Sequence, residues 1–134
     1  MAVVGIAAAF VITARSRARA HSLACAGRLV PLTFVAMEWA DEVGKDRYPT
    51  NLTYLSNRWP AEWLICPSDT SRQSASNWSS FTQENSSYEI VSPGLLQSDT
   101  NSPFLRCRIH GHLSYTDFSV FDGVRRRNKS ELGH

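Results

Sequence analysis

The sequence lacks several features on which common protein functions depend. It has no glycine-rich phosphate-binding loop, and no serine or cysteine lies in a motif with a histidine and a carboxylate, so we expect no enzyme. Only 19% of the residues are charged and the net charge is +2, which is too mild to indicate a nucleic-acid partner. The 134 residues allow at most one domain and an anchor.

A long hydrophobic run at the N-terminus is missing as well. The uncharged apolar run from Ala2 to Ala14 is shorter than the roughly 20 residues that a membrane-spanning helix needs. It continues into Arg15, Arg17 and Arg19 with no cleavable polar segment between. We therefore favour a continuous helix whose first part lies in lipid or in a filament core. The alternative is a signal peptide that ends near residue 20.

Helical periodicity extends this helix to about residue 46. Apolar residues recur at alternating four- and three-residue steps, which places them on one stripe and predicts a packing face. The stripe consists of Cys25, Leu29, Leu32, Ala36, Trp39 and Val43. Pro31 should kink the helix, and Gly44 and Pro49 should end it. A helix of about 40 residues is about 60 Å long, so something other than a small head must bury its first half.

The remainder of the chain predicts a small head. We expect a short helix or turn over 51–63 and a long polar loop over 68–87. Strands are expected over 87–92, 104–109 and 118–121, with a brief fourth from Val124 onward. The fold class is therefore α+β, a long N-terminal helix packed on a small antiparallel sheet. The expected division is a helix over 1–46, with an apolar anchor (2–14) and an amphipathic part (15–46), and a head over 47–134.

Several short motifs occur in a suggestive order along the chain. They are Ser16-Arg17-Ala18-Arg19, then Cys25 and Leu29, Met37 to Glu42, Arg47-Tyr48-Pro49, Cys66-Pro67-Ser68-Asp69, Cys107 to His112, and His112-x9-Asp122-Gly123. This series resembles the pilin-like proteins with prepilin-type helices, which are similar to the pseudopilins of type II secretion systems. The resemblance covers about residues 1–124 and implies the pilin-like form of the α+β fold.

The resemblance also implies a function and a location. It implies a structural subunit of a type II secretion or type IV pilus-like apparatus. Such a subunit is a single-pass protein of the inner membrane, with its head in the periplasm or at the cell surface. Its partners are other pilin-like subunits, in homo- or hetero-oligomers. The family's basic leader and its Gly-Phe-Thr-Leu-x-Glu segment do not occur in this sequence, so we expect either a start upstream of Met1 or a member that has lost processing.

Three cysteines are an odd number for an exported protein. In an oxidising compartment Cys66 and Cys107 are candidates for a disulfide. The alternative is a zinc site made from Cys66, Cys107, His110 and His112. On an extended strand His110 and His112 would share one face and Cys107 the other, unless the chain bends at Gly111. We interpret Cys25 as a small buried apolar residue of the helix stripe.

Two carboxylates near the end of the chain are further metal candidates. Asp117 and Asp122 offer oxygen ligands, but calcium requires six or more, and Asp122 with Gly123 is also typical of a turn. We therefore expect no resident cofactor, with calcium or zinc left open. The alternative to a pilin-like subunit is a membrane-tethered periplasmic module that binds a metal or ligand through Cys107, His110 and His112.

Overall fold

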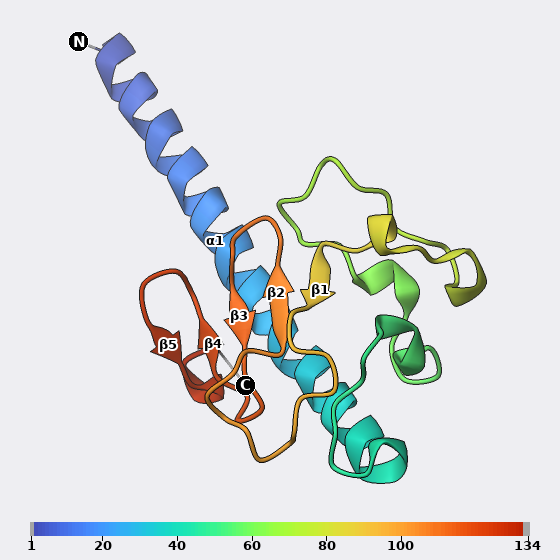
Figure 1. Ribbon diagram of the computed structural model, residues 1–134. Coiled ribbons are helices and arrows are strands. Elements are labelled where there is room, and N and C mark those ends of the chain that lie inside the picture. Colours follow the sequence, from blue (N-terminus) through green and yellow to red (C-terminus); the bar gives the residue numbers. More distant parts are fainter. Residues whose placement is uncertain (1, 133–134) are drawn as a thin grey trace.

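The computed structural model describes residues 2–132, with side chains from residue 14 onward. Helix α1 (Ala2–Trp39) is followed by one turn of π-helix, η1 (Ala40–Gly44). The N-terminal part of α1 stands away from the rest of the chain, and its C-terminal part lies against a head built from later residues (Figure 1). The fold is α+β, as the sequence predicted, with the long helix packed against a small antiparallel sheet.

The projecting and docked parts of α1 differ sharply in burial. Residues 14–21 are all exposed, and Cys25 is the first fully buried side chain among those that the structure describes. From there Leu29, Leu32 and Ala36 are each 0% exposed, which confirms most of the predicted packing stripe. The stretch from Ala14 to Gly44 is long and apolar enough to cross a membrane by length and composition, although much of it is buried by the head.

The prediction that Val43 is the last member of the packing stripe is wrong. Its side chain is 58% exposed, and Ala40 is buried in its place. A stripe with a strict 3.5-residue period drifts around a helix that has 3.6 residues per turn. The π-helical turn η1 then widens the spiral further, so Val43 leaves the packing face. Trp39 stays half-buried against the core.

Pro31 does not interrupt α1, which runs from Ala2 to Trp39 through it. The helix ends near Gly44, as predicted, but left-handed backbone occurs at Lys45 (φ 53°) and Asp46 (φ 67°). Glycine at position 44 also leaves room for the Trp39 side chain. A Cβ atom there would lie 2.6 Å from the indole ring of Trp39, so a larger residue would displace that side chain.

The sheet is a meander. Among residues 2–132 it has five short strands in the order β1 (Tyr88–Ile90), β2 (Leu105–Cys107), β3 (Leu113–Ser114), β4 (Val120–Phe121) and β5 (Arg126–Arg127). Each strand pairs antiparallel with its sequence neighbours, for example Tyr88 with Cys107 and Leu105 with Ser114. The predicted strands 87–92, 104–109 and 118–121 correspond to β1, β2 and β4, and the brief strand after Val124 to β5. Strand β3 was not predicted.

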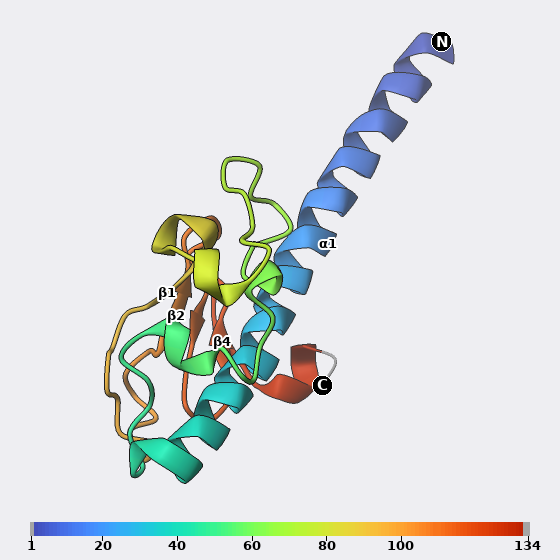
Figure 2. The same ribbon diagram turned by 90° about the vertical axis from the view of Figure 1, so that its right-hand side faces the viewer.

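The sheet covers one side of α1 (Figure 2). Phe104, Leu105 and Val120 from the sheet region are 0% exposed and join the helix stripe in one core. On the other side, the C-terminal turn η6 (Lys129–Leu132) also contacts α1. The docked part of the helix therefore contacts the sheet, η6 and η2 (Leu52–Leu55), whereas the side chains of residues 14–21 are exposed.

The segment between helix and sheet contains short turns. The segment 51–63, predicted as a short helix or turn, contains two 3-10 turns, η2 (Leu52–Leu55) and η3 (Ala61–Trp63). The predicted loop over 68–87 is irregular apart from η4 (Trp78–Ser80) and η5 (Gln83–Asn85). These segments place Leu55, Leu64 and Cys66 in the core beside α1.

Candidate functional site

Four potential metal ligands from three separate segments meet beside α1. Cys25 comes from α1, Cys66 from the segment after η3, and Cys107 and His110 from the end of β2 and the turn that follows. Their ligand atoms all lie within 4.8 Å of one another. The three cysteines are buried and His110 is half-buried, so the cluster is reached from solvent only on the histidine side. It is the only such group of three or more found among the described residues.

A tight turn brings His110 back to Cys107. The Cys107 N–H donates to the His112 carbonyl, and the Gly111 N–H donates to the Cys107 carbonyl. Gly111 has a φ of +72°, which glycine adopts readily, and this bend is the one that the zinc alternative required. His110 Nδ1 lies 3.8 Å from the Sγ of Cys107 and 3.3 Å from the Sγ of Cys66.

The environment of the Cys107 sulfur favours the thiolate. Hydrogen bonds from the thiols of Cys25 and Cys66 lower the pKa of the Cys107 thiol far below its usual range, and they outweigh burial, which raises it. The backbone N–H groups of Ile109 and His110 lower it further. One of the three sulfurs is thus a preferred site of negative charge.

Asp69 fixes the segment that carries Cys66. Its side chain is fully buried and accepts hydrogen bonds from Ser87 Oγ (2.6 Å), Ser71 Oγ (2.8 Å) and the Arg72 guanidinium (3.0 Å). Burial raises the pKa of Asp69, but these hydrogen bonds hold it well below its usual range. Ser87 Oγ in turn accepts from the Cys66 N–H (2.9 Å), so the Cys66-Pro67-Ser68-Asp69 motif is anchored to the start of β1.

The cluster includes three of the four residues that the sequence suggested for zinc. Cys66, Cys107 and His110 meet, but Cys25 takes the fourth position in place of His112. The sequence held one signal for Cys25, because the packing stripe had to turn its side chain toward the head. All three cysteines are free, and the disulfide between Cys66 and Cys107 stays a prediction.

His112 is not part of the cluster but lies next to it. Its ring stacks on that of His110, with centroids 4.9 Å apart, and its Nε2 is 3.3 Å from Ser22 Oγ on α1. Burial lowers the pKa of His112, and the neighbouring His110 lowers it further. His112 and Asp122 line the same polar pocket, so the two ends of the His-x9-Asp-Gly motif lie on one surface.

The carboxylates suggested for calcium are occupied by other partners. Asp117 accepts from Ser119 and forms an ion pair with Arg126 (3.0 Å). Asp122 accepts from the N–H groups of Val124 and Arg125 and pairs with Arg127. These hydrogen bonds hold the pKa of Asp122 well below its usual range. Gly123 has a φ of +95°, which supports the predicted turn. Neither aspartate belongs to the cysteine cluster.

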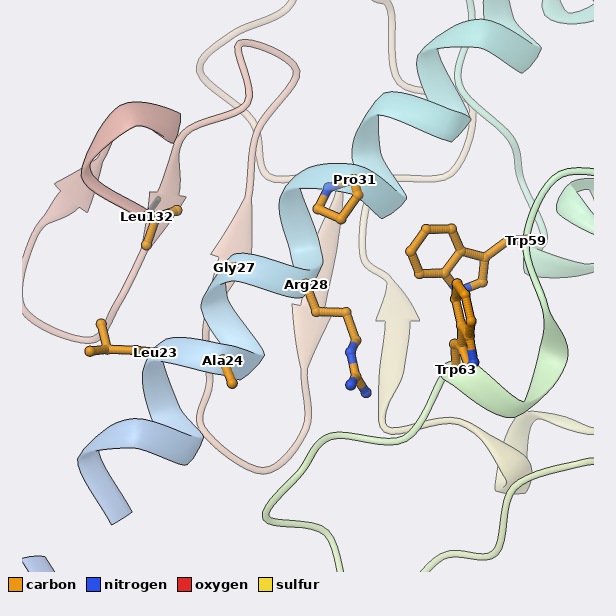
Figure 3. Close-up of a pocket in the computed structure, with 8 residues that line it drawn as sticks. All are labelled: Leu23, Ala24, Gly27, Arg28, Pro31, Trp59, Trp63 and Leu132. Atoms are coloured by element: carbon orange, nitrogen blue, oxygen red, sulfur yellow. The ribbon is translucent and has the colours of Figure 1, made fainter. Parts of the chain in front are cut away.

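The outer face of docked α1 carries an open pocket (Figure 3). Trp59 and Trp63 lie on one side of the helix, Leu23 and Leu132 on the other, and the Arg28 side chain points toward the tryptophans. Leu23 and Trp63 are 50% and 54% exposed. This apolar face of the helix is therefore open to a neighbour.

The comparisons with known proteins give no assignment. No protein-family model matches the chain, and no curated protein or solved structure matches it significantly.

Proposed function

We propose that the protein is a pilin-like structural subunit, anchored in a membrane through the N-terminal part of α1 and assembled with other pilin-like subunits. One observation carries this proposal: a single long helix is covered by the head over only its C-terminal part. A helix of 38 residues extends about 57 Å, and its side chains are exposed from Ala14 to His21. The apolar residues that precede them need lipid or neighbouring helices around them.

The open face of α1 supports the same proposal. Leu23 and Phe34 on α1 are 50% and 47% exposed, so a large part of each apolar side chain is left uncovered in the monomer. In a bundle of subunits these side chains would pack against adjacent helices, while the heads remain outside. The chemistry of such a protein is packing, and no catalytic group is required. Its location would be the inner membrane, with the head in the periplasm or at the cell surface.

Cysteine cross-linking in membranes tests this proposal. In the full-length chain, Ala18→Cys places a thiol on the exposed, projecting part of α1, and Val124→Cys places one on the head, where the side chain is 86% exposed. With a mild oxidant, Ala18→Cys should give cross-linked dimers of the membrane-bound protein more efficiently than Val124→Cys. The proposal is wrong if Ala18→Cys stays monomeric, or if the chain is released with a mature N-terminus near residue 20, as a signal peptide would give.

The cysteine cluster keeps a second candidate function in view, the membrane-tethered binding module. That candidate was based on Cys107, His110 and His112, of which the cluster contains the first two. A module that binds and releases a metal needs a site that solvent can reach. Three of the four candidate ligands here are buried cysteines. We therefore favour the structural subunit, and the two candidates differ in whether copies of α1 contact one another.

A further inference from the structure

We propose that Cys25, Cys66, Cys107 and His110 bind one structural Zn²⁺ ion that fastens α1 to the head. Three cysteines and one histidine form a common ligand set of closed, structural zinc sites. Here Cys107 and His110 are close in the sequence, and every other pair of these ligands is separated by 41 or more positions. The site is independent of the pilin-like role, because it needs only one copy of the chain.

The distances suit a tetrahedral ion. Zinc–sulfur bonds of about 2.3 Å place two sulfur ligands of a tetrahedron roughly 3.8 Å apart, and a nitrogen slightly closer to each sulfur. His110 Nδ1 lies 3.3 Å and 3.8 Å from the two sulfurs of Cys66 and Cys107, and no pair of ligand atoms exceeds 4.8 Å. The four atoms can therefore surround one ion with side-chain shifts of an ångström or less.

Each sulfur has a hydrogen-bond donor from outside the ligand set or from the turn backbone. The N–H groups of Ile109 and His110 serve Cys107, and the Ser68 N–H serves Cys66. The Tyr88 hydroxyl lies 3.9 Å from the sulfur of Cys25. Such donors stabilise metal-bound thiolates and orient them, as the outer shell of a zinc site does.

The charge balance also fits. Zn²⁺ with three thiolates and a neutral imidazole carries a net charge of −1, which is costly to bury without a cation nearby. Arg28 follows Cys25 by three residues on α1, and its guanidinium donates to the Ile65 carbonyl at 2.5 Å, next to Cys66. A permanent positive charge is thus held beside the segment that carries Cys66.

The position of the site gives it a role. All four coordination positions are supplied by the chain, so no open position remains for a substrate, which is typical of a structural ion. Cys25 is the first fully buried side chain of α1 within residues 14–132, at the point where the helix leaves the head. An ion there would hold the base of the projecting helix rigidly.

Metal analysis of the full-length chain tests the inference. The protein is purified in detergent with a reductant and without chelator, after growth with added zinc. We expect one zinc per chain, and with Co²⁺ the absorption bands of a tetrahedral thiolate site. Cys107→Ser and His110→Gln should each weaken Co²⁺ affinity by more than about 100-fold, because even outer-shell changes cost 10- to 100-fold.

The matched control is His112→Gln, which alters the adjacent buried ring but removes no ligand. It should keep the stoichiometric metal and the cobalt spectrum. The inference is overturned if the wild type contains no more zinc than Cys107→Ser, or if His112→Gln loses metal as completely as His110→Gln. It is also overturned if peptide mapping of protein from an oxidising compartment finds Cys66 joined to Cys107. Cross-linking through Ala18→Cys does not depend on these results, so failure of one proposal leaves the other intact.

Discussion

The two parts of α1 have similar secondary structure and opposite environments. From Cys25 to Ala40 the helix is buried every three or four residues by the sheet and by the turns of the head, whereas residues 14–21 are exposed all round. Helix propensity alone does not produce this contrast, since alanine and arginine on the projecting part are also good helix formers. The difference shows that tertiary packing stabilises the docked part of the helix. The projecting part depends on its own helix propensity unless a membrane or a partner covers it.

The largest effect should come from the core of the docked part. Leu32→Ala removes a side chain that is 0% exposed and should lower the free energy of unfolding by about 2–5 kcal/mol. Leu23→Ala is the same substitution at a 50% exposed position on the same helix and should change it by less than about 0.5 kcal/mol. Guanidinium denaturation of both variants in detergent checks this, and equal losses would show that the two environments are not distinct.

A smaller effect should come from Asp69, which anchors the segment that packs on the docked part. Asp69→Asn replaces an acceptor with an amide whose N–H₂ cannot accept from Ser87 and Arg72, and should cost about 1–3 kcal/mol at neutral pH. The pKa of Asp69 in the folded protein lies below its ordinary value of about 3.9. Its stabilisation is therefore complete above that value and is lost as the pH falls toward the folded-state pKa.

The dependence of stability on pH tests the role of the Asp69 carboxylate. Below about pH 4 the wild type should lose stability more steeply than Asp69→Asn, measured by denaturation midpoints across an acid series. Leu23→Ala, which removes no titrating group, is the control and should keep the wild-type slope. An unchanged slope in Asp69→Asn would contradict the assignment.

The smallest effect should come from the exposed end of the docked part. Glu42 pairs with Arg58 at 2.5 Å, and this pair links η1 to the segment after η2. Because the Glu42 side chain is 62% exposed, Glu42→Gln should leave the denaturation midpoint within error at physiological salt and lower it only at low ionic strength. A salt-independent loss as large as that of Asp69→Asn would mean that the pair holds the helix end in place.

The spacing of apolar residues and the residues typical of turns predicted most of the fold. The packing stripe from Cys25 to Ala36 and the main strands were visible because apolar side chains recur at the spacing of the element that buries them. Strand β3 was missed because Leu113 and Ser114 are too few to show an alternation, and only pairing with β2 and β4 makes them a strand. Val43 was misassigned because a π-helical turn has no sequence signature in a short window.

The candidate site was predictable only in part. Cys107 and His110 are three residues apart, so a single turn at Gly111 determines whether they meet, and the sequence could present that as an alternative. Cys25 and Cys66 join them through tertiary packing, which depends on how the segment after η3 lies on α1. Sequence separation hides such contacts, so the partner thiols of Cys25 could not be identified from the chain alone.

The order of the strands has a consequence for how the chain becomes folded during synthesis. Every strand of the sheet pairs with its sequence neighbour, so β1 to β5 can assemble locally as residues 88–127 emerge. The helix stripe, by contrast, is made first and gains its partners from the sheet only after those strands have been made. At about 5–20 residues per second, the apolar face of α1 remains uncovered for several seconds after it leaves the ribosome. During that interval lipid or a chaperone must shield it, so early membrane insertion would also protect the nascent chain from aggregation.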